Sequence, residues 1–368
     1  MNYNAQKLIY TKSGSRHTAH NAIDIVKFIC AALVVTIHVP PFSDINWVLN
    51  FAAVNFAARV AVPFFFVSSA YFVFLKAFDE SSGTFGINTG VLLKNAARVF
   101  RLYAVWSLIY LPFSYLNMRA VSESMSIAGF IKYYLKDFLF STGYGHLWYL
   151  CAVAWSYLAL ALLLKAKIKP SVIAAFAFIM YLLGLTTQSW YGLFAPILST
   201  EPVQAVIIPL KVIFKTARGA LCEGLLFTLI GMFFAKYEMR ISQKCAYICL
   251  AVSSVLYAAE VFTLAKLGYS REYDMYLGLI TTVFFMFYIC INTELPESPV
   301  YKKFRTSSAL VYFSHMLFAE CLMRIPRLEK IFSTSFSQYL FTYICSLCLS
   351  LIIIKLSEKL PLLKRLYR

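Results

Sequence analysis

The chain has 368 residues, of which 60% are hydrophobic and only 14% are charged, and its mean hydropathy is +0.69. Soluble domains carry roughly 25% charged residues, so a soluble fold could not bury this much apolar surface. About ten membrane spans of roughly 20 residues each would use most of the length. The composition therefore predicts an all-α, polytopic membrane helix bundle and leaves no room for a second domain.

The apolar runs along the chain predict where these spans lie. The first run follows a polar stretch at residues 1–21 and lacks a small-residue cleavage site, which indicates a retained helix rather than a signal peptide. The predicted spans are 22–38, 51–75, 99–115, 147–164, 171–187, 220–234, 246–264, 275–291, 310–322 and 339–356.

Lysine and arginine predict the orientation of the bundle. If the N-terminus is cytoplasmic, the segments on the inner side hold about twice as many of these residues as the outer loops. We therefore expect both termini inside, with a tail at 1–21, a transmembrane domain at 22–357 and a basic tail at 358–368. The net charge of +17 fits this bias and an attraction to anionic lipids better than nucleic-acid binding.

Two outer stretches, 117–145 and 188–218, are longer than simple connectors. The apolar residues of the segment 127–140 are spaced for a helix that lies in the membrane interface. Prolines 196, 202 and 209 predict that the second stretch is irregular. Either stretch could cover a site from the outer side.

Nine cysteines lie mostly within the apolar runs. Cys245 with Cys249, and Cys345 with Cys348, have helical spacing, but neither pair has a histidine or an acid at metal-ligand spacing. Cysteine packs well as a small apolar residue, so we expect no metal site.

Ionisable residues inside predicted spans are candidates for function, because a charge in the bilayer costs several kcal/mol. The first span carries Asp24, Lys27 and His38. Lys27 and His38 are 11 positions apart, which places them within about 20° of one helical face and about 16 Å apart along it. A neutral histidine can accept a proton from a hydroxyl near pH 7. The alternative is that Lys27 reaches the inner headgroups and His38 only ends the span.

The second and third groups of polar residues occur along the rest of the chain. In the second span, Arg59 precedes a proline and the pair Ser68 and Ser69, and helix packing is the alternative to function here. The third group is His146, Trp148, Tyr149, Arg218, Glu223, Tyr312 and His315. Trp148 and Tyr149 also fit an interfacial aromatic belt. Glu223 needs a partner, for which Arg218 and His38 are candidates.

Taken together, these motifs resemble the integral-membrane acyltransferase-3 family, which includes bacterial O-acetyltransferases of surface polysaccharides. The likeness runs from residue 23 to about residue 356. Asp24, Lys27 and His38 match the acidic residue, the basic residue and the histidine of the family's first span, although the basic residue is usually arginine. The run VPFFFVSSAYF resembles the family motif V-P-x-F-F-x-x-S-G-Y, with Ser69 where glycine is common. The third group also follows family patterns.

The resemblance implies transfer of an acyl group, usually acetyl, from cytoplasmic acyl-coenzyme A to a hydroxyl of an extracytoplasmic glycan or lipid-linked sugar, in a bacterial plasma membrane. His38, supported by Lys27 and Asp24, would be the general base, and Lys27, Arg59 and Arg218 would stabilise negative charge. Lys94, Arg98 and Arg101 share one helical face and are candidates for binding the donor phosphates, or for a positive-inside anchor. The remaining binding candidates are Ser68, His146, Trp148, Tyr149, Glu223 and His315.

Two other classes of function remain open. Ten spans with buried charges also suit a secondary transporter or flippase, but we find no inverted repeat. A nonenzymatic membrane receptor would tolerate replacement of His38. The acceptor, the acyl chain, the oligomeric state and any separate partner that completes the transfer are open, and we favour His38 over His315 because Asp24 and Lys27 share its span.

Overall fold

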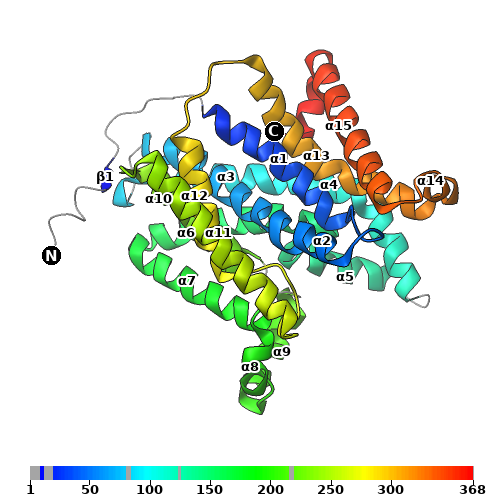
Figure 1. Cartoon of the computed structure of the whole chain (residues 1–368), viewed down its shortest axis with the longest axis horizontal. Helices are drawn as coiled ribbons and strands as arrows, with labels where there is room; N and C mark the ends of the chain where they lie inside the picture. The colour runs from blue at the N-terminus through cyan, green and yellow to red at the C-terminus, as the bar shows by residue number, and fades with distance from the viewer. Residues whose placement is uncertain (1–8, 12–19, 80–83, 123–125, 215–218, 368) are drawn as a thin grey trace.

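The computed structural model describes residues 9–11, 20–79, 84–122, 126–214 and 219–367, and these residues form a bundle of helices (Figure 1). A short sheet pairs β1 (Ile9–Thr11) antiparallel with β2 (Tyr237–Met239). The α-helices are α1 (Asn21–His38), α2 (Trp47–Ala52), α3 (Ala61–Asp79), α4 (Thr89–Val121), α5 (Ile127–Phe140), α6 (Trp148–Lys165), α7 (Pro170–Thr187), α8 (Tyr191–Leu198), α9 (Glu201–Phe214), α10 (Leu225–Lys236), α11 (Gln243–Lys266), α12 (Leu277–Ile291), α13 (Pro299–Arg324), α14 (Pro326–Ile331) and α15 (Ser335–Lys359).

Short helical turns of other types join several of these helices. Two of these turns are π-helical, and the others are 3₁₀ helices. The π-helical turns are η1 (Ala53–Ala57) and η5 (Ala220–Gly224), and the 3₁₀ turns are η2 (Ala58–Val60), η3 (Thr84–Gly86), η4 (Gly145–Leu147) and η6 (Pro361–Leu366).

The all-α class is confirmed, but the count of about ten spans is not. Each predicted run falls on a helix, yet only seven helical segments in the described part of the chain are long and apolar enough to cross a membrane, or eight if the bent pair α8 and α9 is one span. α10 has 12 residues and α12 has 15, so each is short for a full span. The first turns of α13 carry Lys302, Lys303 and Arg305, which lowers the hydropathy of that helix. The chain is a multi-pass membrane protein.

The prediction that the stretch 188–218 is irregular is wrong for most of its length. α8 and α9 are helices that meet at a bend of 110°. Pro202 lies in the first turn of α9, where the missing backbone N–H has no intrahelical partner to lose. By contrast, α5 occupies the residues predicted for the interfacial helix.

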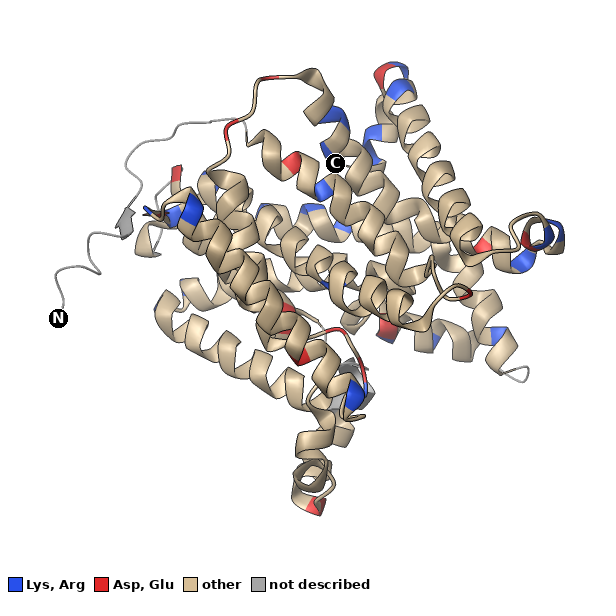
Figure 2. Ribbon diagram, viewed as in Figure 1, with Lys and Arg blue, Asp and Glu red and all other residues tan. Residues whose placement is uncertain are grey.

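Basic residues gather at one end of the bundle. Figure 2 shows Lys and Arg near the start of α13, the end of α15 and the turn at β2, while others lie on α14. The first group lies at the end that the charge bias predicts to be cytoplasmic, and we call this the inner end and the opposite one the outer end.

Close backbone contact holds α3 against α10 at the centre of the bundle. A Cβ atom on Gly231 would lie 2.5 Å from the Val67 carbonyl oxygen and 2.6 Å from Cβ of Ala70. Neither neighbour can move as a flexible side chain would. We expect Gly231→Ala to lower the free energy of unfolding by about 1–3 kcal/mol through overpacking. Thermal unfolding in detergent compares this variant with Gly219→Ala, because a Cβ built on Gly219 meets no described residue within 4 Å apart from its neighbours in the chain. Equal midpoints of the two variants would contradict the close contact.

A carboxylate in the loop after α1 caps the outer start of α15. Ser335 donates its backbone N–H to Oδ2 of Asp44 at 2.9 Å and its hydroxyl to Oδ1. The hydroxyl and then the backbone hydrogen bond lower the pKa of Asp44. The contribution is fully present above about pH 4, the unfolded pKa of aspartate, and is lost as the pH falls through the lower folded pKa.

We therefore expect Asp44→Asn to lower the thermal midpoint at pH 7 and to have progressively less effect as the carboxylate of the native protein is protonated. Melting curves between pH 7 and pH 3 measure this difference, with Asp79→Asn as the control for loss of one negative charge. A deficit of constant size across the range would rule out the capping carboxylate as its cause.

Candidate active site

Three histidines from distant parts of the chain meet near the outer end of the bundle. His38 ends α1, His146 lies in η4 and His315 lies in the middle of α13. The ring centroids are 5.2 Å apart for His38 and His315, 4.8 Å for His146 and His315, and 6.2 Å for His38 and His146. His38 is exposed, whereas His146 and His315 are 2% and 0% exposed. An accessible imidazole thus has two buried imidazoles behind it.

Backbone carbonyls of α13 hold the two buried rings. Nδ1 of His315 lies 2.8 Å from the carbonyl oxygen of Tyr312, and Nε2 of His146 lies 3.2 Å from that of Phe313. A carbonyl oxygen only accepts, so both of these nitrogens carry hydrogen. The other ring nitrogen of each of these two histidines is buried and has no hydrogen-bond partner among the described residues. The Tyr312 hydroxyl donates to the His146 carbonyl oxygen, which ties η4 to α13.

A polar cluster around Glu320, which the sequence analysis missed, supports this arrangement from the outer side. Glu320 is 2% exposed and accepts hydrogen bonds from Tyr144, from Asn117 at 3.3 Å and from Nε of Arg324 at 2.7 Å. The Tyr144 ring stacks on Tyr110 at 4.5 Å. An acid in an apolar run with an arginine four positions later is a signal in the sequence for a paired buried charge.

The same tyrosine stack connects the cluster to the histidines. The Tyr110 hydroxyl donates to the Phe313 carbonyl oxygen at 2.7 Å, and the Tyr110 and His146 rings meet edge to face at 4.9 Å. The polar cluster around Glu320 therefore fixes the histidine site without supplying a charge to it, because Arg324 pairs with Glu320.

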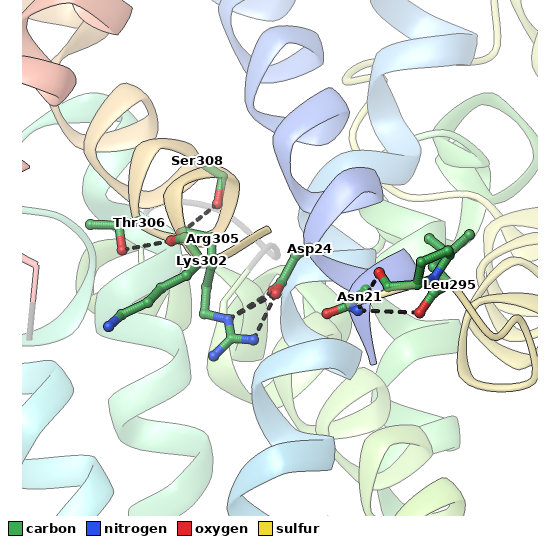
Figure 3. Close-up of polar contacts among 8 residues, drawn as sticks. Asn21, Asp24, Leu295, Lys302, Arg305, Thr306 and Ser308 are labelled. Atoms are coloured by element: carbon green, nitrogen blue, oxygen red, sulfur yellow. Dashed lines mark hydrogen bonds and ion pairs between the residues drawn. The ribbon is translucent and has the colours of Figure 1, made fainter. Parts of the chain in front are cut away.

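At the inner end, Asp24 is held by a residue that the sequence analysis did not assign to the site. Figure 3 shows Arg305 of α13 reaching Asp24 of α1. Nε of Arg305 lies 2.9 Å from Oδ1, and a terminal guanidinium nitrogen lies 2.6 Å from Oδ2. The Asp24 side chain is 1% exposed and that of Arg305 is 53% exposed. One turn before Asp24, Asn21 donates to the carbonyl oxygens of Leu295 and Pro296.

Lys27 lies beside this ion pair. It is within electrostatic range of Asp24, Arg305 and Arg98. Lys27 and Arg98 thus add two positive charges beside the Arg305–Asp24 ion pair at the inner end of α1, α4 and α13, which makes this region attractive to an anion. Lys94, Arg98 and Arg101 are all exposed along α4.

Arg59 and the serines of α3 make other contacts. Arg59 forms an ion pair with Asp274 and donates to Asn55 at 3.1 Å, and both members of the pair have side chains 13% exposed. Asp274 lies in a loop far along the chain, so no local pattern predicts the pair. Ser68 is buried and bonds the carbonyl oxygen of Phe65 at 3.2 Å.

The remaining predicted residues lie around the centre of the bundle. The Ser69 hydroxyl and the Tyr149 hydroxyl are 3.1 Å apart, and Trp148 packs near Phe66. Glu223 is 2% exposed in η5. Arg218 lies outside the described residues. In the part of the chain that the structure describes, no three His, Cys, Asp or Glu side chains are arranged to hold one metal ion.

Comparison with known proteins identifies three curated relatives. Two proteins of Enterococcus faecalis named "Amino-acid racemase" are 28% identical over 361 residues and 25% identical over 287 residues. "Serine/alanine racemase" of Enterococcus gallinarum is 25% identical over 270 residues. These matches cover 95%, 76% and 73% of this chain but only 48%, 37% and 36% of the relatives.

No solved structure matches the chain. The family model described as "Acyltransferase domain" matches residues 20–355, which is nearly the whole chain and includes all three histidines of the site. The chain therefore belongs to the acyltransferase-3 family of membrane acyltransferases.

Proposed function

We propose that this protein transfers an acyl group, and first of all acetyl, from cytoplasmic acyl-coenzyme A to a hydroxyl of an extracytoplasmic glycan or lipid-linked sugar. The observation that carries the proposal is the arrangement of charged and polar residues along α1, the first helix of the bundle. It has a cationic region around Lys27 at one end and the accessible ring of His38 at the other. The two residues are about 16 Å apart along one helical face.

The inner region suits the donor. Lys27 lies within electrostatic range of Arg98, Arg305 and Asp24, and phosphates bind where cations are in excess. Coenzyme A carries its thioester on a long, flexible pantetheine arm. A nucleotide held at the inner end can therefore present its thioester deeper in the bundle, toward His38. Lys94 and Arg101 would add positive charge on the exposed face of α4.

The outer region suits the chemistry. His38 accepts the proton of the acceptor hydroxyl while the hydroxyl oxygen forms a bond to the thioester carbonyl carbon. The tetrahedral intermediate then expels the thiolate as the carbon–sulfur bond breaks, and the proton passes from His38 to that sulfur. Atoms and charge are therefore balanced in this transfer with His38 as the one base.

The racemase names belong to proteins that this chain matches over less than half of their length. We propose no racemisation for residues 20–355, because the family model that covers them describes an acyltransferase domain. A transporter or flippase remains the second candidate, and it would move its substrate without breaking a thioester.

Sealed vesicles test the sidedness of the proposal. Acetyl-labelled coenzyme A is supplied either at the cytoplasmic face or at the opposite face of vesicles that contain the native protein and membrane glycan, with protein-free vesicles as the control. We expect label in the glycan only when the donor is at the cytoplasmic face. Label only with the donor at the opposite face would contradict the proposed path.

A further inference from the structure

Two loops at the outer end of the bundle hold a group of buried polar atoms that lack hydrogen-bond partners. The loop after α7 supplies Gln188 and Ser189, and the loop before α12 supplies Tyr276. These residues are 1%, 0% and 0% exposed. The Gln188 amide oxygen and nitrogen and the hydroxyls of Ser189 and Tyr276 have no partner among the residues that the structure describes. Buried polar atoms are normally satisfied, so this group needs an explanation.

Hydrogen bonds tie the two loops together. The carbonyl oxygen of Gln188 accepts from the backbone N–H of Arg271 at 3.1 Å. The carbonyl oxygen of Ser189 accepts from the Ser270 hydroxyl at 3.1 Å. The Ser270 hydroxyl also lies near that of Tyr276 without making a hydrogen bond to it. Gln188, Ser189 and Tyr276 therefore lie in one region, which we call the outer polar site.

The surrounding contacts hold the outer polar site in shape. Tyr181 of α7 donates its hydroxyl to the carbonyl oxygen of Tyr276 at 2.7 Å. Glu260 of α11 accepts from Nε1 of Trp190 at 2.8 Å and from the backbone N–H of Gly278 at 2.8 Å. None of these bonds uses the side-chain amide or either hydroxyl of the site. The frame is thus fixed by other groups, as in a site that is formed before its ligand binds.

The unpartnered groups indicate a neutral ligand with several hydroxyls. An amide offers two donors and an acceptor, and a hydroxyl can donate and accept. Adjacent hydroxyls on a sugar ring do both as well, so they match this mixture. Arg59 lies within electrostatic range of Tyr276, but it is paired with Asp274. A charged ligand would have to compete with that ion pair, whereas a neutral sugar would not.

We propose that Gln188, Ser189 and Tyr276 bind a neutral sugar unit of the acceptor and help to determine its specificity. The inference rests on the proposed function, because it names the part of the acceptor that this end of the protein recognises. α12 begins next to Tyr276 and packs against α1, the helix that ends in His38. Residues 269–276 lie in neither a helix nor a strand, and this loop must move to admit the sugar to the buried atoms.

Binding of simple sugars tests the site without any assay of acyl transfer. The native protein in lipid nanodiscs is titrated by saturation-transfer NMR with the methyl glycosides of glucose, galactose, rhamnose and N-acetylglucosamine, and with serine as a charged ligand. We expect binding of at least one glycoside, weakened about tenfold in Gln188→Met, which removes the amide at nearly constant volume. The matched variant Gln243→Met, at an exposed position near the inner start of α11, should bind as the native protein does.

Three results of this titration would overturn the proposal. They are no binding of any glycoside, which would leave the site to water only, equal binding by Gln188→Met and the native protein, and binding of serine alone.

Stability shows whether these groups serve a ligand or the fold. A buried group without a partner costs free energy, so Gln188→Met and Tyr276→Phe should not lower the thermal midpoint of the ligand-free protein. Tyr181→Phe is the control, because its hydroxyl is paired in the folded protein and its loss should lower the midpoint. Lower midpoints in Gln188→Met and Tyr276→Phe would mean that the fold itself satisfies these groups, and would contradict a ligand site.

Kinetics connect the site to the acceptor. We expect Gln188→Met and Tyr276→Phe to raise KM for the acceptor glycan about tenfold, with kcat and KM for acetyl-coenzyme A changed less than about threefold, because the lost interactions act on binding. An unchanged KM for the glycan would reject the assignment. If the native protein transfers no acyl group, the proposed function fails, whereas the binding of the glycosides still decides the sugar site.

Discussion

Replacement of His38 by alanine is expected to lower acyl transfer by about 10²- to 10⁴-fold, the usual contribution of a general base. His38 is the accessible member of the histidine cluster, and no other described ring of the cluster is exposed. The loss should appear in kcat, because the base acts while the hydroxyl attacks. The rate of label transfer from acetyl-labelled coenzyme A, at equal protein abundance, measures it.

His20→Ala is the matched control for this change. His20 precedes the same helix, and its Nε2 lies 2.9 Å from the Tyr71 hydroxyl at the inner end, far from the histidine cluster. We expect this variant to transfer the label at nearly the native rate. Full activity of His38→Ala would contradict the assignment of His38 as the general base.

The second large effect is expected at the inner end, where Arg305→Ala should lower the free energy of unfolding by about 3 kcal/mol. The change leaves the carboxylate of Asp24, whose side chain is 1% exposed, without its guanidinium partner. The N-terminus of α1 and the nearby Lys27 offset part of the cost. Chemical unfolding in mixed micelles measures the difference.

Two further variants separate this ion pair from a general loss of charge. Lys302→Ala removes a cation from the exposed face of the same helix and should change stability by less than about 0.5 kcal/mol. Asp24→Asn combined with Arg305→Ala should be less destabilised than Arg305→Ala alone, because no charge is left buried. If Arg305→Ala is no worse than Lys302→Ala, the pair contributes little.

The sequence predicts the membrane class and the location of most helices, because apolar runs of fixed length leave few alternatives. It does not decide the number of full spans. α10 and α12 are apolar but short, and α13 is long but begins with basic residues. Whether such a helix crosses the membrane depends on its packing against neighbours, which no single run contains.

The sequence likewise predicts only part of the candidate site. His38, His146 and His315 stand out in the sequence as polar residues in apolar surroundings, and the structure brings them together. The partners of the charged residues do not stand out. Arg305 lies 281 positions from Asp24, and Asp274 lies 215 positions from Arg59, so only the tertiary structure pairs them.

The most direct test of the account is chemical. Purified native protein is reconstituted with membrane glycan and acetyl-labelled coenzyme A, and free coenzyme A and alkali-labile acetyl ester are measured together. The account predicts that both appear in equal amounts. Movement of a small polar or glycolipid substrate across the membrane with no release of coenzyme A would contradict it and would identify a transporter.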